Sequence, residues 1–364
     1  MRPTWMEVDL EAIRANTAAL AAAVAPAALC AVVKADGYGH GDVPSAEAAL
    51  DAGASWLAVA LVAEGARLRE ADIEAPILLL SEPDPADAAE VVRWRLTPTA
   101  YRHSFLDALE QVAPPGFPVQ VKVDTGMHRV GAPPVLAAEL ARRVAASPLH
   151  LQGIWTHFAV AEEDAAYTAT QLRGLRTVVE ALAAGGVRPE MIHAANTAGG
   201  LAFADARLDL VRAGIGLFGL RPAPHLAPEV PLRPAMRVVS QVSYLQRLPA
   251  GARPSYGRRR PLPAAATVAT IPMGYADGVP RRLAEKGGSV LIGGKRHPFA
   301  GAITMDQIVV DVGDEPVAMG NEVVLLGRQG AEVITADEWA ERLGVLHYEV
   351  VCGFGPRLPR RYLP

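Results

Sequence analysis

The sequence has few cysteines, few aromatic residues and almost no excess of either charge. Its two cysteines, Cys30 and Cys352, are too few for a disulfide framework, and because both lie in apolar runs we expect free, buried thiols. A net charge of −4 over 364 residues gives no electrostatic case for a nucleic acid or an anionic membrane as partner.

Long apolar runs are also missing. Residues 18–33 are uncharged, but they contain Pro26 and are shorter than the run of about 18 apolar residues that a membrane span needs. Charged side chains interrupt the N-terminus from Arg2 onward, so it does not look like a secretory signal. We therefore expect a cytoplasmic protein that binds neither membrane nor nucleic acid, and we assign no metal site.

The length and a proline cluster divide the chain in two. With 364 residues, 51% of them apolar, the chain can form two domains with substantial cores. Five prolines fall within residues 221–234, which is typical of a linker. We therefore expect one domain over residues 1–232 and a second over residues 233–364.

Short apolar runs alternate with helical segments in the first part. After a predicted amphipathic helix over residues 9–25, strands are expected at 29–33, 56–60, 77–80, 95–99, 118–123, 150–156, 190–194 and 208–211. Eight β-then-α units are the number in a TIM-type (β/α)8 barrel, although periodicity alone leaves an open doubly wound sheet as the alternative. In a barrel, the strands' C-terminal ends carry the active site.

The second part is predicted to be mostly β. Apolar runs punctuated by glycine or proline predict strands at 236–245, 266–271, 289–292, 306–312 and 322–326, with one helix over 336–343.

The most informative stretch surrounds Lys34. The apolar run 29–33 leads directly into Lys34, and Gly37, Gly39 and Gly41 follow it. A lysine at a buried strand end can lose solvation, which lowers its pKa and allows it to form a Schiff base. By residue type alone, a solvated lysine is the commoner explanation.

Three stretches together resemble one family. The segment 32–41, Val-Val-Lys-Ala-Asp-Gly-Tyr-Gly-His-Gly, resembles the cofactor-lysine motif of alanine racemases, which use pyridoxal 5′-phosphate (PLP). The segment 122–131, Lys-Val-Asp-Thr-Gly-Met-His-Arg-Val-Gly, is similar to a second racemase motif. Ser-Tyr-Gly at 255–257, Gly-Tyr-Ala-Asp-Gly at 274–278 and Met-Asp-Gln at 305–307 match a third set, so the resemblance spans both predicted domains.

The resemblance implies a role for each matching residue. A homodimer would interconvert L- and D-alanine for the cell wall, with Tyr256 and Met305 reaching into the partner's site. Lys34 and Tyr256 would be the two catalytic bases. The remaining assignments are Tyr38, Asn196, Thr197, Gly214 and Ile215 around the cofactor phosphate, Arg212 at the pyridine nitrogen with His157 supporting it, Arg129 and Met305 on the substrate carboxylate, Lys122 as a carbamylated lysine, and Tyr275 and Asp306 near the entrance.

Two positions depart from the family pattern. Pro356 stands where many members have a tyrosine that touches the phosphate, and Ala302 stands where an arginine is frequent. Both lie near the expected entrance, so a broad-specificity or serine-preferring racemase is the near alternative, and Phe354 is a candidate to refill the space. An amino-acid decarboxylase of similar plan and a PLP-carrier barrel protein are more distant alternatives. Tyr256 argues against the former, and the predicted β domain against the latter.

Overall fold

The computed structural model describes residues 2–364, which form two compact units. Residues 11–37 and 41–233 form the barrel unit. Residues 2–10, 38–40 and 234–364 form the C-terminal unit.

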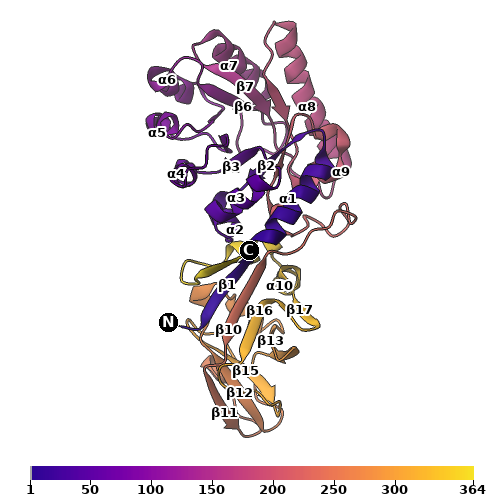
Figure 1. The fold of residues 1–364 in the computed structure, drawn as a ribbon. Helices are drawn as coiled ribbons and strands as arrows, with labels where there is room; N and C mark the ends of the chain where they lie inside the picture. Colours follow the sequence, from indigo (N-terminus) through magenta and orange to yellow (C-terminus); the bar gives the residue numbers. More distant parts are fainter. Residues whose placement is uncertain (1) are drawn as a thin grey trace. The chain divides into compact units, whose positions relative to one another are not determined.

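Eight parallel strands form the ring of the barrel unit (Figure 1). They are β2 (Ala28–Val32), β3 (Trp56–Val59), β4 (Ile77–Leu79), β5 (Thr99–Ala100), β6 (Pro118–Lys122), β7 (His150–Trp155), β8 (Met191–His193) and β9 (Leu210–Ala213). They pair in the orders β4-β3-β2-β9 and β5-β6-β7-β8. Parallel bridges Leu78–Thr97 and Asn196–Arg212 join the two sheets at both edges, which closes the ring. The closed ring confirms the predicted barrel over the open sheet.

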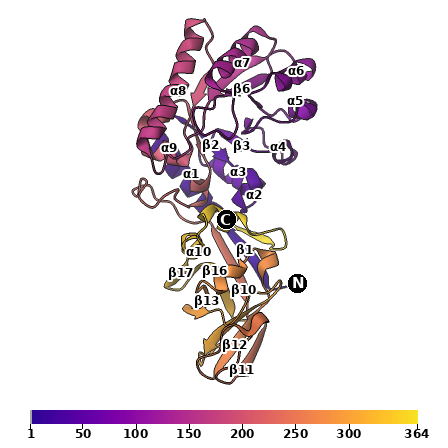
Figure 2. The same ribbon diagram turned by 180° about the vertical axis from the view of Figure 1, so that it is seen from behind.

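Helices lie outside the ring, as Figures 1 and 2 show. They are α1 (Leu10–Val24), α3 (Asp42–Asp51), α4 (Val62–Glu70), α5 (Ala88–Arg93), α6 (His103–Val112), α7 (Pro134–Ala146), α8 (Ala165–Ala184) and α9 (Thr197–Ala202), with 3-10 turns η1 (Pro85–Asp87), η2 (Ala204–Ala206) and η3 (Ile215–Phe218). The element α2 (Lys34–Tyr38) is a left-handed turn that follows β2. Strands β3, β4 and β9 are buried along their whole length, because helices cover one face and the barrel interior the other.

The strand predicted over residues 95–99 is misplaced. Arg95 has a φ of 50°, a left-handed conformation that interrupts an extended run. Thr97 therefore makes only a bridge to Leu78, and the paired strand β5 starts at Thr99. The other seven predicted strands agree with the structure to within two residues at their ends.

The C-terminal unit is mostly β. Its elements are β1 (Thr4–Asp9), β10 (Met236–Gln241), β11 (Tyr244–Leu248), η4 (Tyr256–Arg258), β12 (Ala266–Ile271), η5 (Tyr275–Asp277), η6 (Arg281–Ala284), β13 (Ser289–Ile292), β14 (Lys295–Pro298), β15 (Ile308–Gly313), β16 (Glu322–Gln329), β17 (Glu332–Ile334), α10 (Ala336–Leu343), α11 (His347–Cys352) and β18 (Arg360–Leu363). One sheet has the order β14-β13-β16-β10-β1-β18, with β17 paired to β16, and a smaller one has the order β11-β12-β15.

Three expectations for this unit are corrected. Residues 4–9, expected in the barrel domain, form β1, which pairs antiparallel with β10 and parallel with β18. The single strand expected over 236–245 is two strands, because the backbone partner changes from β16 to β12 between Gln241 and Tyr244. Cys352 is exposed at the end of α11 rather than buried, whereas Cys30 is buried; neither forms a disulfide.

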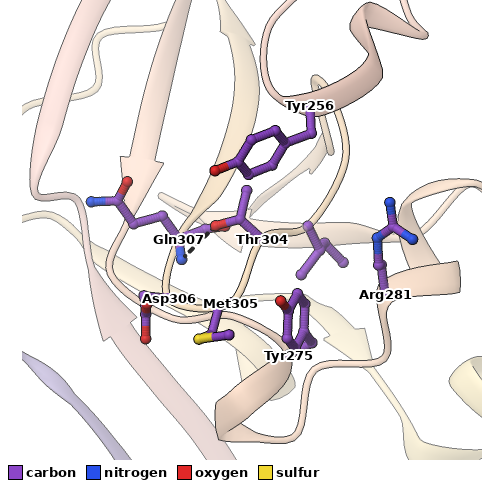
Figure 3. A pocket seen from close by; sticks show the side chains of 8 residues that line it. Tyr256, Tyr275, Arg281, Thr304, Met305, Asp306 and Gln307 are labelled. Atoms are coloured by element: carbon purple, nitrogen blue, oxygen red, sulfur yellow. Dashed lines mark hydrogen bonds between the residues drawn. The ribbon is translucent and has the colours of Figure 1, made fainter.

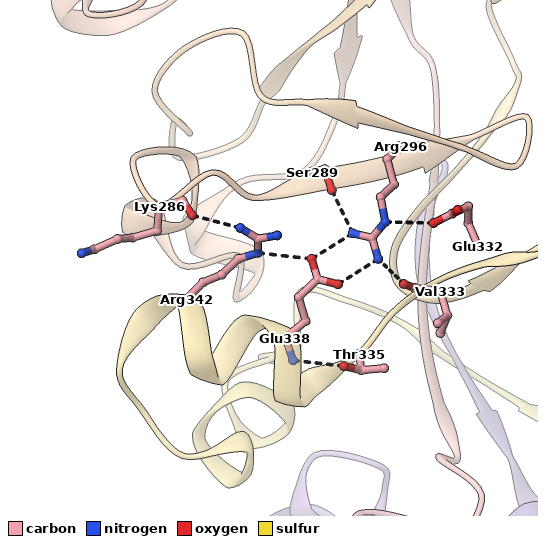
Figure 4. A network of polar contacts seen from close by, with 8 residues as sticks. All are labelled: Lys286, Ser289, Arg296, Glu332, Val333, Thr335, Glu338 and Arg342. Atoms are coloured by element: carbon pink, nitrogen blue, oxygen red, sulfur yellow. Dashed lines mark hydrogen bonds and ion pairs between the residues drawn. The ribbon is translucent and has the colours of Figure 1, made fainter.

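A polar network ties β14, β17 and α10 together (Figure 4). Arg296 forms a bidentate ion pair with Glu338, both at 2.9 Å, and a further ion pair with Glu332 at 2.9 Å. Arg342 adds a bond to Glu338 at 3.2 Å. Burial opposes ionisation of Glu338, but the two arginines outweigh it and lower the pKa of this carboxyl. Shared, bidentate pairs of this kind hold the helix on the sheet better than isolated surface pairs.

Among residues 2–364, no helix combines the length and the apolarity that crossing a bilayer requires.

Candidate active site

Three side chains at the ends of adjacent barrel strands lie side by side. Lys122 of β6 is in register with Trp155 of β7, which is in register with His193 of β8. The rings of Trp155 and His193 stack at 5.4 Å with an interplanar angle of 9°. The Lys122 ammonium lies 4.3 Å from the centre of the Trp155 ring. Parallel register thus builds one wall of the barrel mouth.

Arg212 of β9 lies fully buried beside this wall. Its Nη1 donates to Nδ1 of His193 at 2.5 Å, and its Nη2 donates to the carbonyls of Thr156 and Ala194 at 2.8 and 2.9 Å. Nη2 also lies 3.2 Å from Nδ1 of His157. All of these acceptors are neutral groups. The guanidinium is therefore oriented from several strands without an acidic partner among these contacts.

Both histidines are held in the neutral form. Burial, followed by the charges of Arg212 and Lys122, lowers the pKa of His157 and of His193 well below the ordinary value. His193 accepts from Arg212 at Nδ1, so its proton is on Nε2, which donates to the Gln120 side-chain oxygen at 2.8 Å. Nε2 of Gln120 in turn donates to Oε1 of Gln152 at 3.3 Å. These hydrogen bonds fix the tautomer of His193 and the orientation of the Arg212 guanidinium.

The barrel mouth carries an excess of positive charge. Lys122 is 3% exposed, and burial, followed by the charges of Arg212, Arg129 and Lys34, lowers its pKa to about 7. Asp124 is the acid that opposes these charges on Lys122. Burial also lowers the pKa of Arg212 to about 10, which leaves the guanidinium charged at neutral pH. Such a cluster suits an anionic ligand.

One atom of Arg212 has no partner within the described chain. Its Nε is buried and makes no hydrogen bond to any of residues 2–364. Buried donors are normally satisfied, so an unpaired one in a cationic site points to an acceptor on a bound group. A pyridine nitrogen is such an acceptor, and a phosphate matches the surrounding charge. The donor set therefore fits PLP.

Lys34 opens a left-handed turn. Ala35, Asp36 and Gly37 have φ and ψ near +55° and +50°, and Tyr38 has a φ of 51°. Each non-glycine residue in this conformation costs roughly 1–2 kcal/mol. The amide of Gly37 donates to the Val33 carbonyl at 2.9 Å, which closes the turn. The chain therefore does not continue strand β2, which ends at Val32. Lys34 instead precedes a strained stretch of backbone.

The far end of this turn is packed within the C-terminal unit. The Tyr38 ring lies 6.3 Å from that of Tyr348, and burial, with Tyr348 and Cys352 adding to it, raises the pKa of Tyr38. A side chain at Gly39 would approach the Val351 carbonyl to 2.4 Å. Arg360 donates to the Gly39 carbonyl at 2.8 Å.

Four of the residues expected near the phosphate lie at the ends of β8 and β9, whereas the fifth, Tyr38, belongs to the C-terminal unit. Asn196 caps α9, accepting from the Gly199 amide at 2.9 Å. The Thr197 hydroxyl accepts from the Gly214 amide at 3.0 Å, and Ile215 begins η3. Arg129, the expected carboxylate clamp, is exposed in the loop after β6.

Tyr256, Tyr275 and Met305 line one pocket of about 720 Å³ in the C-terminal unit (Figure 3). Tyr256 is 74% exposed and Met305 52% exposed in the single chain. The hydroxyl of Ser255 donates to the Ala302 carbonyl at 2.6 Å and anchors the loop that carries Tyr256. The pocket joins side chains from three separate segments.

A second ion-pair chain supports this pocket. Arg357 contacts Asp306 at 2.7 Å and the buried Asp277 at 3.5 Å, and Arg2 pairs with Asp277 through both carboxylate oxygens. Pro356, beside Arg357, is exposed. Phe354, the candidate to refill the space, is buried and packs against Trp339 with ring centres 6.1 Å apart.

Sequence reasoning assigned no role to Gln120, Trp155 or His193. A usable signal was present, because polar or aromatic residues near the ends of otherwise apolar strands face the barrel mouth. The pairing of Arg357 with Asp306 had no such signal, since 51 residues separate them.

The fold and site define a class of protein: a closed parallel barrel with a buried cationic mouth, joined in one chain to a β unit with a tyrosine-lined pocket. Comparison with known proteins narrows this class. The model of the alanine racemase N-terminal domain matches residues 8–222, and that of the C-terminal domain matches residues 235–362.

Full-length relatives agree with these matches. The alanine racemase of Symbiobacterium thermophilum is 45% identical over 368 residues, covering 100% of this chain and 97% of that protein. The alanine racemase structures from Enterococcus faecalis and Streptomyces lavendulae have TM-scores of 0.94 and 0.93 at 37% and 36% identity, each covering 100% of this chain and 98% of the other. The chain belongs to the alanine racemase family, whose members are isomerases.

The close approach at Gly39 yields a first prediction. Gly39→Ala should destabilise the protein more than Gly116→Ala, by about 1–3 kcal/mol. Both glycines have a φ near 80°, so alanine carries the same conformational penalty at each position. An added Cβ would lie 2.4 Å from the Val351 carbonyl oxygen at Gly39, whereas at Gly116 it would meet open space. Chemical denaturation of the two variants measures the difference. Equal losses would show that the loop can retreat from Val351.

Proposed function

We propose that this member of the family interconverts L- and D-alanine with PLP, using Lys34 and Tyr256 as its two bases. The observation that carries the proposal is the buried cationic mouth of the barrel, where the Nε of Arg212 has no partner within residues 2–364. The cluster suits an anionic cofactor with a ring acceptor.

Each part of the cofactor would have its own group of residues. Lys34 would hold it covalently, and Arg212, supported by His157, would face the pyridine nitrogen. Tyr38, Asn196, Thr197, Gly214 and Ile215 would surround the phosphate. When bound, PLP supplies the electron-withdrawing ring that acidifies the substrate Cα–H bond. Arg212 stays charged and does not readily give up a proton, so it limits this withdrawal and disfavours side reactions such as transamination.

The chain's own groups would then move the proton. Racemisation needs an acceptor on each face of Cα; Lys34 Nζ would serve one face and Tyr256 Oη the other. Arg129 and Met305 would bind the substrate carboxylate, with Tyr275 and Asp306 at the entrance. The exposure of Tyr256 and Met305 in the single chain supports a homodimer in which each subunit completes its partner's site.

The rivals have less support. The match of residues 235–362 to the racemase C-terminal domain argues against a PLP-carrier barrel and against a decarboxylase. Nothing observed favours broad or serine-preferring specificity. We place the activity in the cytoplasm, where D-alanine would supply peptidoglycan synthesis.

Lys34 should be the residue that PLP modifies. Protein purified with PLP should absorb near-visible light, and borohydride followed by peptide mapping should place the label on the Lys34 peptide. Lys34→Ala should lose the label while keeping its fold by circular dichroism. Labelling that persists at Lys122 or any other lysine in this variant would refute the assignment.

Lys122 should carry a carbamate in a pH-dependent manner. Only the neutral amine adds CO₂, and with a pKa of about 7 Lys122 is mostly neutral at pH 8 but becomes protonated as the pH falls through 7. With ¹³C-bicarbonate, a carbamate carbon signal should therefore be strong at pH 8 and fade toward pH 6. Lys122→Arg is the control that should lack it at every pH. A signal that does not change between these pH values would contradict the assignment.

The shared site predicts complementation between inactive variants. Lys34→Ala mixed with Tyr256→Phe should recover about a quarter of wild-type activity, because half of randomly exchanged dimers are mixed and one of their two sites is intact. Subunit exchange is verified by mass-tagged chains. If exchange is complete and no activity returns, each site draws Lys34 and Tyr256 from the same chain.

A further inference from the structure

The carboxylate of Glu64 binds three backbone amides at two strand ends. Its Oε2 accepts from the amides of Ala60 and Leu61 at 2.8 and 3.0 Å, and its Oε1 accepts from the amide of Ala35 at 2.7 Å. The side chain is only 7% exposed. It comes from the first turn of α4, whereas Ala35 lies 29 residues earlier, after β2.

Helix capping explains only part of this arrangement. Glu64 is the third residue of α4, and its bond to the Leu61 amide is the reciprocal half of a capping box. The bond to Ala35 lies outside that motif and uses the other oxygen. A cap alone needs one acceptor atom, so the second oxygen has a separate task.

The amide that this oxygen holds belongs to the Lys34–Ala35 peptide bond. Ala35 is the first left-handed residue of the turn, with φ 53° and ψ 50°. Strained backbone persists only where its surroundings hold it in place. The hydrogen bond from the Ala35 amide to Glu64 therefore restrains the backbone next to the Lys34 Cα, where the chain leaves the extended conformation of β2.

We propose that Glu64 is a positioning residue for Lys34: its carboxylate locks the left-handed turn and thereby aims the lysine side chain. The inference rests on the proposed role of Lys34. It predicts that loosening this bond affects the proton-transfer step more than the binding of alanine, because the carboxylate of the substrate is held by other residues.

Glutamine cannot replace the carboxylate at this position. Its amide has one acceptor oxygen, and its NH₂ group would face an N–H donor on the other side. If the oxygen keeps the cap at Ala60 and Leu61, the Ala35 amide loses its acceptor. Glu64→Gln therefore removes the proposed bond with little change in volume.

The barrel offers a matched control in Glu82. This buried glutamate, 8% exposed, also accepts two backbone amides after a strand, those of Tyr101 and Arg102, and pairs with the Arg102 side chain. It has no bond to the Lys34 turn. Glu82→Gln should cost stability without moving Lys34.

The experiment compares the two variants with the wild type in two ways. In PLP-free protein, hydrogen exchange measured by mass spectrometry should quicken in the peptide covering residues 34–41 for Glu64→Gln and stay at the wild-type rate for Glu82→Gln. In PLP-loaded protein, kcat should fall about 10- to 100-fold for Glu64→Gln, with KM for alanine within about twofold. Glu82→Gln should keep both constants.

Adding Ala35→Gly to Glu64→Gln should recover several-fold in kcat, because glycine adopts positive φ without penalty. Equal exchange at residues 34–41 and equal kcat in the two glutamate variants would overturn the proposal. If Glu64→Gln does not fold, Glu64→Asp, which keeps the charge but is too short to span both strand ends, is measured with the same criteria. A wild type that fails to label at Lys34 would refute the proposed function instead, since the exchange result does not depend on PLP.

Discussion

The candidate site depends on the buried guanidinium of Arg212, whose hydrogen bonds within residues 2–364 are made without a carboxylate. Arg212 is fully buried, and its hydrogen bonds go to two carbonyls and two neutral histidines. Burying a charge in this way is unfavourable unless its hydrogen bonds are made. The carbonyls of Thr156 and Ala194, just past β7 and β8, and the rings of His157 and His193 supply those bonds, so the barrel pre-forms a cationic site in which Nε has no partner among residues 2–364.

The rest of the barrel mouth adapts to that charge. Neutral His157 and His193 accept from Arg212 because the same charge, together with burial, lowers the pKa of each ring. The pKa of Lys122 is lowered as well, to about 7, which leaves its amine largely uncharged near pH 8. Arg212 thus keeps its positive charge while the two rings beside it are held neutral, which leaves a positive potential at the barrel mouth that suits an anionic ligand.

The sequence predicted much of this arrangement, and its failures have a physical pattern. Seven barrel strands and the strands 266–271 and 289–292 were predictable because short, mostly apolar runs bounded by turn residues indicate buried strands. Strand β1 was missed because its register is set by β10, more than 200 residues away. The left-handed turn after Lys34 was hidden as well, since alanine disfavours positive φ and aspartate adopts it mostly as a single residue, whereas here Ala35 and Asp36 adopt it in succession.

Site residues divide along the same line. Those carried by a local motif, such as Lys34 and Tyr256, could be proposed from the sequence, with roles taken from resemblance to a family. Those defined by distant contacts were not: Glu64 reaches Ala35 from another strand end, and Arg357 reaches Asp306 across 51 residues. Local sequence reports which side chain is present, whereas the closed ring determines what it touches.

The two proposed bases, Lys34 and Tyr256, each lie next to residues with positive φ. Lys34 precedes three non-glycine residues with positive φ, and Tyr256 directly follows Ser255, whose φ is 67°. Each strained segment is held by close packing elsewhere: Gly39 against the Val351 carbonyl, and Gly301 against the Pro254 carbonyl, where a side chain would approach to 2.4 and 2.3 Å. A relaxed backbone at either base would be more stable locally but would let the side chain sample several directions. In the proposed mechanism, each base must be held at a fixed distance from the substrate Cα. The strained backbone beside Lys34 and Tyr256 fits this requirement, because it restricts the direction of each side chain.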